Sequence, residues 1–156
     1  MIYGTTDQAL QKLADAIAND PSKIQTYQVT STRGTGRIVY RSGIFAIKKA
    51  RNISSGVVQN RSEFAVWNME VNQHRLNKVR AISEDGSILI ANWVVPVTNL
   101  EFRLNKLETT HNDEIKQILT EYKQLNKTAK IVHDYDEPSS WGKTHNGYVL
   151  IDYAIW

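Results

Sequence analysis

The sequence predicts an α+β fold, a mainly antiparallel sheet of consecutive hairpins with an N-terminal helix and a second helix near 113–125 packed on one face. Three observations predict it. The chain opens with an amphipathic segment, continues with several β-patterned runs that turn signals separate, and carries a second amphipathic segment before its last strands. The chain has 156 residues and no linker-like stretch, so residues 1–156 are expected to form a single domain.

The first two elements are an expected helix and an expected strand. Residues 7–19 have the pattern of a helix, because Leu10, Leu13 and Ile17 recur at the spacing of one helical face. Alternating β-branched and polar residues then predict a strand over 24–33. The apolar stripe of the helix would face the sheet.

A three-residue loop, Gly34-Thr35-Gly36, is expected to connect this strand to a return strand over 37–49. The apolar positions of the return strand change from even numbers, such as Ile38, to odd numbers, such as Ile47. A β-bulge at Ser42-Gly43 would keep both sets on the core face. The opposite face would then carry Arg37, Val39, Arg41 and Lys48.

The middle of the chain is less regular. Residues 52–60 are expected to form a loop, and residues 63–81 fit both a helical and a strand period, of which we favour strands. Asp85-Gly86 is a strong two-residue turn signal, and it joins strands expected over 78–83 and 88–95.

The last third contains the strongest helical pattern of the chain. Residues 100–104 alternate as a strand, and residues 113–125 have an apolar stripe and an acidic first turn that suits a helix N-terminus. Two strands, over 131–135 and 148–155, are expected to close the sheet around a polar loop.

The charges are unevenly distributed along the chain. Residues 1–20 carry one base and three acids, residues 21–62 carry eight bases and no acid, and residues 63–156 carry ten bases and thirteen acids. The acid-free segment indicates either a solvated basic face or a face that binds an anion. In the second interpretation the phosphate contacts would come from Arg33, Arg37, Arg41, Lys48, Lys49, Arg51 and Arg61.

The glycine-containing turn has two interpretations. Gly34-Thr35-Gly36 superficially resembles a phosphate-binding loop, but a hairpin turn explains it, and the chain has none of the established P-loop, dinucleotide-binding or kinase-type motif sets. Arg33 and Arg37 flank the turn and are expected to repel each other across the strands. An anion between them would remove this repulsion.

Residues 133–147 contain the densest group of residue types that support catalysis. His133, Asp134 and Asp136 could hold a divalent cation or transfer protons, although an acidic strand end explains them as well. Trp141 either belongs to a binding loop or fills the core beneath it, and His145 could lie near His133.

The absence of cysteine excludes disulfides, thiolate metal sites and cysteine nucleophiles. We expect no cofactor and no bound metal. No secretory signal opens the chain, and its longest nearly apolar run, residues 88–97, is too short to span a membrane. A cytoplasmic protein without a membrane partner is therefore expected.

The leading hypothesis is a non-enzymatic binding protein whose basic β-hairpin face engages nucleic acid or another polyanion, such as an acidic protein surface. One alternative is a protein-binding inhibitor or a subunit of a homo-oligomeric assembly. Another is a small phosphodiester hydrolase that uses the loop over 133–147. The sequence leaves open whether the protein is an enzyme, and it identifies no catalytic residue.

Overall fold

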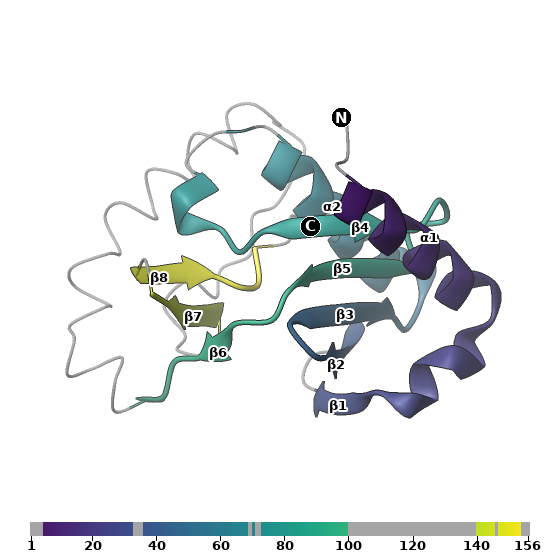
Figure 1. The fold of residues 1–156 in the computed structure, drawn as a ribbon, viewed down its shortest axis with the longest axis horizontal. Helices are drawn as coiled ribbons and strands as arrows, with labels where there is room; N and C mark the ends of the chain where they lie inside the picture. Colours follow the sequence, from purple (N-terminus) through teal and green to yellow (C-terminus); the bar gives the residue numbers. More distant parts are fainter. Residues whose placement is uncertain are drawn as a thin grey trace.

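The computed structural model describes residues 5–32, 36–68, 70, 73–99, 140–145 and 147–153. These residues form the expected α+β architecture (Figure 1), with an N-terminal helix, a second helix and an antiparallel sheet of hairpins. The helices are α1 (Thr5–Asn19) and α2 (Val58–Asn68), with a 3-10 turn over Pro21–Thr26, a π turn over Ile53–Val57 and a 3-10 turn over Gln73–Arg75. The strands are β1 (Gln28–Ser31), β2 (Arg37–Ser42), β3 (Phe45–Ala50), β4 (Val79–Ile82), β5 (Ile88–Asn92), β6 (Val95–Pro96), β7 (Trp141–Thr144) and β8 (Gly147–Leu150).

The strands form two sheets. The larger sheet has five antiparallel strands in the order β1-β2-β3-β5-β4, so β5 lies between β3 and β4, and α2 connects β3 to β4. The smaller sheet has the order β6-β7-β8 and lies beside the larger one (Figure 1). They are joined by the pairing of Leu76, before β4, with Leu150 at the end of β8, and by the chain that leads from β5 into β6.

Apolar side chains cover both faces of the larger sheet. Helix α1 packs against β4 and β5, where its residues Ala14 and Ile17 bury Ile90 and Ile47. Helix α2 lies on the other face, where Val66 packs with Leu89 and with the smaller sheet. Because successive residues of a strand face opposite sides, β3 and β5 each contribute to both layers.

The return strand predicted over 37–49 is two strands, and the predicted bulge at Ser42-Gly43 is wrong. Ser42 pairs with Phe45 across a tight turn in which Gly43 has a φ of 58°, a conformation that glycine adopts without strain. This turn accounts for the change of the apolar positions from even to odd numbers. Ile47 therefore faces α1, and Lys48 faces the opposite side of the sheet with Val39.

The predicted loop over 52–60 and the favoured strands over 63–81 are also wrong in part, because residues 58–68 form α2. The side chain of Asn52 accepts hydrogen bonds from the backbone N–H groups of Ser55 and Gly56, and so begins the helical segment. The buried positions of α2 include Gln59, Asn60 and Glu63. A helix whose buried face is this polar leaves almost no hydrophobic periodicity in the sequence.

Other predicted elements are confirmed or shortened. The first helix and the Asp85-Gly86 hairpin between β4 and β5 are present, and Gly86 has a φ of 76°. Among the described residues, the strand predicted over 24–33 is limited to β1, because Pro21–Thr26 forms a 3-10 turn, and the strand predicted over 148–155 is limited to β8. The strands predicted over 100–104 and 131–135 and the helix predicted over 113–125 lie outside the described residues.

Within the described ranges, no helix reaches the length and hydropathy that a membrane-spanning segment needs.

Candidate functional site

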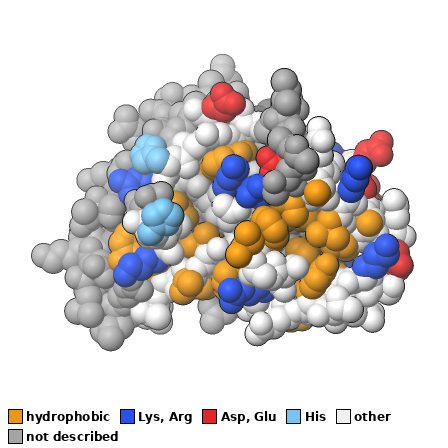
Figure 2. Space-filling model, in the orientation of Figure 1, with side chains coloured by type: hydrophobic (Ala, Val, Ile, Leu, Met, Phe, Trp, Pro, Cys, Tyr) orange, Lys and Arg blue, Asp and Glu red, His pale blue; other side chains and the backbone are white. Residues whose placement is uncertain are grey.

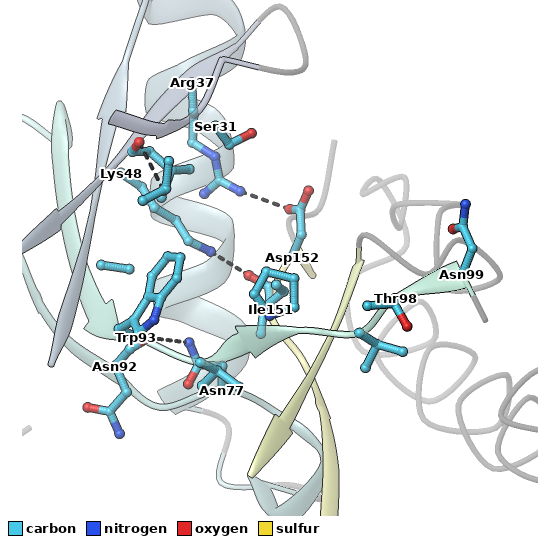
Figure 3. Close-up of a pocket in the computed structure, with 16 residues that line it drawn as sticks. Ser31, Arg37, Lys48, Asn77, Asn92, Trp93, Thr98, Asn99, Ile151 and Asp152 are labelled. Atoms are coloured by element: carbon cyan, nitrogen blue, oxygen red, sulfur yellow. Dashed lines mark hydrogen bonds and ion pairs between the residues drawn. The ribbon is translucent and has the colours of Figure 1, made fainter. Parts of the chain in front are cut away.

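A pocket of about 500 Å³, here called the central pocket, lies on the face of the larger sheet opposite α1. Its walls come from three parts of the chain that are distant in sequence, shown in Figure 3. Strands β1, β2 and β3 form one wall, residues 92–99 after β5 form the second, and Ile151 and Asp152 after β8 form the third.

Lys48 extends from β3 into the central pocket and is held by a buried carboxylate. Its Nζ atom lies 2.9 Å from both carboxylate oxygens of Glu63, which α2 places on the same face of the sheet. The Lys48 and Glu63 side chains are 6% and 1% exposed. Nζ also donates a hydrogen bond of 2.6 Å to the backbone oxygen of Ile151, so the ammonium group links the helix to the third wall of the pocket (Figure 3).

Arg37 lies at the start of β2 and binds the same carboxylate. Its Nη2 atom is 2.9 Å from Glu63 Oε1 and 2.8 Å from Asp152 Oδ1, and its Nη1 atom is 3.3 Å from Asn60 Oδ1. Arg37 is 6% exposed, whereas Asp152 is 45% exposed. We call Arg37, Lys48, Glu63 and Asp152 the ionic cluster.

The cluster shifts the titration of its members. Burial opposes ionisation of Glu63, but Arg37 and then Lys48 lower the pKa of this carboxyl group to about 2 through charge and hydrogen bonds. Burial is also the largest influence on Arg37, yet Glu63 and Asp152 together raise the pKa of the guanidinium. For Lys48, burial outweighs the attraction of Glu63 and lowers the pKa of the ammonium group. Glu63 is therefore ionised at neutral pH.

Apolar side chains also line the central pocket. Val39 and Ala46 line it from the sheet, and Trp93, Val94 and Val97 line it from the connecting segment. Trp93 is held in place by its backbone N–H, which donates to Ile44, and by the guanidinium of Arg41, which lies 4.8 Å from the ring centre. Trp93 and Val94 belong to no strand or helix.

Gly36, which directly precedes β2, packs against the start of α2 and the segment before it. A Cβ atom on Gly36 would meet the side chains of Gln59 and Ser55, and one on Gly56 would meet the backbone of Gly36 and Ala50. The Gly36 oxygen also accepts a hydrogen bond of 2.8 Å from the backbone of Arg51. Close packing therefore requires glycine at position 56, where the neighbours are backbone atoms, whereas the side chains that face Gly36 can move.

The seven predicted phosphate-contacting bases do not share one exposed face. Arg37 and Lys48 are brought together in the central pocket, Arg41 stacks on Trp93, and Lys49 points to the other side of β3. Arg51 and Arg61 are exposed and donate to the backbone oxygens of Thr32 and Glu84, and Arg33 lies outside the described residues. On the face in Figure 2, Lys and Arg side chains are scattered among hydrophobic and uncharged groups.

Carboxylates of the chain itself bind Arg37, for which the sequence suggested an external anion. The guanidinium contacts two carboxylates, Glu63 and Asp152, both of which lie outside the acid-free segment. The expected excess of positive charge is thus partly neutralised internally.

Of the candidates over 133–147, His133, Asp134 and Asp136 lie outside the described residues. Trp141 is fully buried in the core between the two sheets, as expected if it fills the core, and it begins β7 within the predicted loop. His145 is exposed. In the described part of the chain, no three metal-ligating side chains gather into a possible metal site.

A second cavity, of about 640 Å³, lies next to Trp93 and Val94 and is here called the basic pocket. Its basic lining residues are His74, Arg75, Lys78, Lys143 and His145. No acidic residue of the described ranges lines it. None of these five bases belongs to the acid-free segment.

Glu63 and Asp152 are the site residues that the sequence did not indicate. One short sequence pattern points to Lys48, the partner of Glu63. Phe45-Ala46-Ile47-Lys48 resembles the V-A-I-K motif, in which a strand lysine contacts nucleotide phosphates and a helix glutamate. The run is hard to recognise by itself, because a single lysine after three apolar residues is common in strands.

The chain was also compared with known proteins. No protein-family model and no curated protein matches it. One solved structure resembles it, described as the GDP complex of wild-type aminoglycoside 2'-phosphotransferase-IIIa, with 13% sequence identity and a TM-score of 0.43 over 94% of this chain and 74% of that chain. A likeness at this level carries no argument about function.

Proposed function

We propose that the central pocket binds a nucleoside triphosphate and that the chain belongs to a protein that transfers a phosphoryl group. The observation that carries the proposal is the pairing of Lys48, on the third strand, with Glu63 of the helix that follows. Protein kinases use a lysine of strand β3, paired with a glutamate of the neighbouring helix, to hold the α- and β-phosphates of ATP.

The shape of the central pocket supports this proposal. Its lining combines cationic and apolar side chains, which suit the two parts of a nucleotide, because phosphates need positive charge and a purine ring needs apolar surfaces on both faces. Val39 and Ala46 would contact one face of the ring. The backbone of Trp93 and Val94 would lie along the edge of the base.

Besides the Lys48–Glu63 pair and the apolar lining, Asp152 is a third feature that the central pocket shares with the nucleotide site of protein kinases. It is the carboxylate of the described residues that lines the central pocket, and it lies next to Arg37. In protein kinases an aspartate of the D-F-G motif binds Mg²⁺, and here Asp152 is followed by Tyr153 and Ala154. A magnesium ion that accompanies the nucleotide would be held by Asp152 and would neutralise phosphate charge.

A binding experiment on neighbouring lysines tests the proposal. Lys48→Gln removes the buried cation, whereas Lys49→Gln removes the same charge one residue away on the opposite face of β3. Binding of ATP and of GTP is measured by calorimetry with Mg²⁺, and quenching of the intrinsic tryptophan fluorescence gives a second readout. We expect wild type and Lys49→Gln to bind at least one triphosphate equally, and Lys48→Gln to bind it about 10- to 100-fold more weakly, the range for a charge-assisted hydrogen bond.

Two results would contradict the proposal. One is the absence of binding of either triphosphate to the wild-type chain at millimolar concentration. The other is equal loss of binding in both variants, which would indicate a general effect of net charge.

A second candidate function is polyanion binding, and the basic pocket favours it. Five basic side chains border one cavity, which suits a phosphate backbone or an acidic peptide. Under this proposal Lys78→Gln weakens the binding of a single-stranded oligonucleotide in 50 mM salt, whereas Lys23→Gln, outside both pockets, does not. Equal binding by both variants would argue against this role. The assembly-subunit and hydrolase hypotheses stay predictions.

A further inference from the structure

We infer that Arg37 is a second phosphate-binding residue of the central pocket. The Asp152 carboxylate binds the Arg37 guanidinium until a nucleotide phosphate replaces it. The inference rests on the proposed function and adds an exchange of partners at one end of the pocket. Three features of the ionic cluster carry it: the position of Arg37, the exposure of Asp152 and the balance of charges.

The position of Arg37 places a second cation beside Lys48. The two side chains extend from neighbouring strands toward Ile151 and Asp152 (Figure 3), and both line the central pocket. The planar guanidinium binds carboxylates and phosphates with the same geometry, since both offer pairs of oxygens to its N–H groups. A phosphate can therefore replace a carboxylate on Arg37 without a change in the arginine.

The two carboxylates bound to Arg37 differ in their freedom to leave it. Glu63 is 1% exposed and is held by both cations, so it stays in place. Asp152 is 45% exposed and follows the last strand of the smaller sheet. Rotation of the Asp152 side chain into solvent would break its ion pair with Arg37 and would bury no other group.

The charges of the cluster favour the exchange. Arg37 and Lys48 carry two positive charges, and Glu63 and Asp152 carry two negative charges, so the cluster is neutral when all four are ionised. A triphosphate that entered beside an Arg37-bound Asp152 would meet this carboxylate as a like charge. Departure of Asp152 from Arg37 leaves one net positive charge for the phosphates and frees the carboxylate for a cation.

The exchange predicts opposite effects for two variants in the presence of EDTA, where no divalent cation contributes. Arg37→Gln is expected to bind ATP and GTP at least tenfold more weakly and to bind adenosine and guanosine like the wild type. Asp152→Asn keeps the shape of the side chain, removes its charge, and is expected to bind the triphosphates three- to tenfold more tightly. Lys49→Gln serves as the matched control and is expected to behave like the wild type.

The results separate this inference from the proposed function. If the wild type binds neither triphosphate, with or without Mg²⁺, the proposed function fails and the inference fails with it. If the wild type binds but Arg37→Gln binds the triphosphates within twofold of it, only the inference fails. If Arg37→Gln loses the far-UV circular dichroism of the wild type, the test rests on Asp152→Asn alone. Triphosphate binding by Asp152→Asn that is no tighter than that of the wild type then overturns the proposed exchange.

Discussion

Glu63 is the residue on which the candidate site depends most directly. A buried carboxylate is unfavourable unless it is paired and hydrogen-bonded, and Glu63 receives two bonds from Lys48 and one from Arg37. The pairing orients both cations toward the central pocket. Loss of Glu63 would leave two cations close together in a buried site.

The lowered pKa of Glu63 predicts acid sensitivity. Because the pKa is about 2 in the folded chain and near 4.5 in the unfolded chain, ionised Glu63 stabilises the fold above pH 4.5, and this stabilisation is lost as the pH falls toward 2. Between pH 5 and pH 3 the loss from this one group is about 2 kcal/mol. Chemical denaturation of the wild type and of Glu63→Gln across this range measures it.

Glu63→Gln is expected to be less stable than the wild type at pH 7 and to show a smaller loss between pH 5 and pH 3. Glu84→Gln, which changes an exposed carboxylate of the β4–β5 turn, is the control and should follow the wild-type profile. Parallel profiles for the wild type and Glu63→Gln would show that Glu63 is not the titrating group.

At the scale of elements, the contact between Gly36, directly before β2, and Gly56, before α2, determines where Arg37 lies. Gly36 and Gly56 approach each other so closely that a side chain on Gly56 would meet the backbone of Gly36 and Ala50. Backbone atoms cannot move away as the end of a flexible side chain can. Gly36, and with it the start of β2 at Arg37, is thereby held against the segment before α2.

Gly56→Ala is expected to destabilise the fold by about 1–3 kcal/mol, the usual cost of overpacking. Gly43→Ala provides a comparison, because Gly43 has open space around it and only its φ of 58° opposes a side chain, at a cost of about 1 kcal/mol. Only Gly56→Ala should also weaken triphosphate binding. Urea denaturation and calorimetry measure the two effects, and weaker binding in Gly43→Ala alone would contradict the assignment.

At the scale of the whole molecule, the central pocket exists only because the smaller sheet is attached to the larger one. The Tyr153 hydroxyl donates a hydrogen bond of 2.7 Å to the backbone oxygen of Asn77, and the Asn77 N–H donates one of 2.8 Å to Leu150. These bonds fix the chain on both sides of Asp152, between β8 and the buried ring of Tyr153.

Tyr153→Phe tests this attachment. It keeps the buried ring but leaves the Asn77 oxygen without its donor, which costs about 1–3 kcal/mol of folding free energy. Because the position of Asp152 is also loosened, the effect of Mg²⁺ on triphosphate affinity should be smaller than in the wild type. Thermal melting and calorimetry with and without Mg²⁺ measure the two effects, and an unchanged melting temperature would show that the hydrogen bond does not hold the sheets together.

Local pattern predicted those features that depend on neighbouring residues. The apolar stripe of α1 and the turn at Asp85-Gly86 are properties of short segments, and both are present. Helix α2 was missed, because its buried face is occupied mainly by Gln59, Asn60 and Glu63 and its apolar period is therefore weak. The polar residues that weaken the helical pattern of this segment are the residues that form the candidate site or pack beside it.

The sequence by itself determined the fold class, the first helix, the β4–β5 hairpin and the concentration of bases before residue 63. Only the tertiary structure decided which of those bases turn inward. Glu63 lies 15 positions from Lys48 and 26 from Arg37, and Asp152 lies 115 positions from Arg37. A buried charge must find its partner in space rather than along the chain, so the ionic cluster leaves no periodic signal in the sequence.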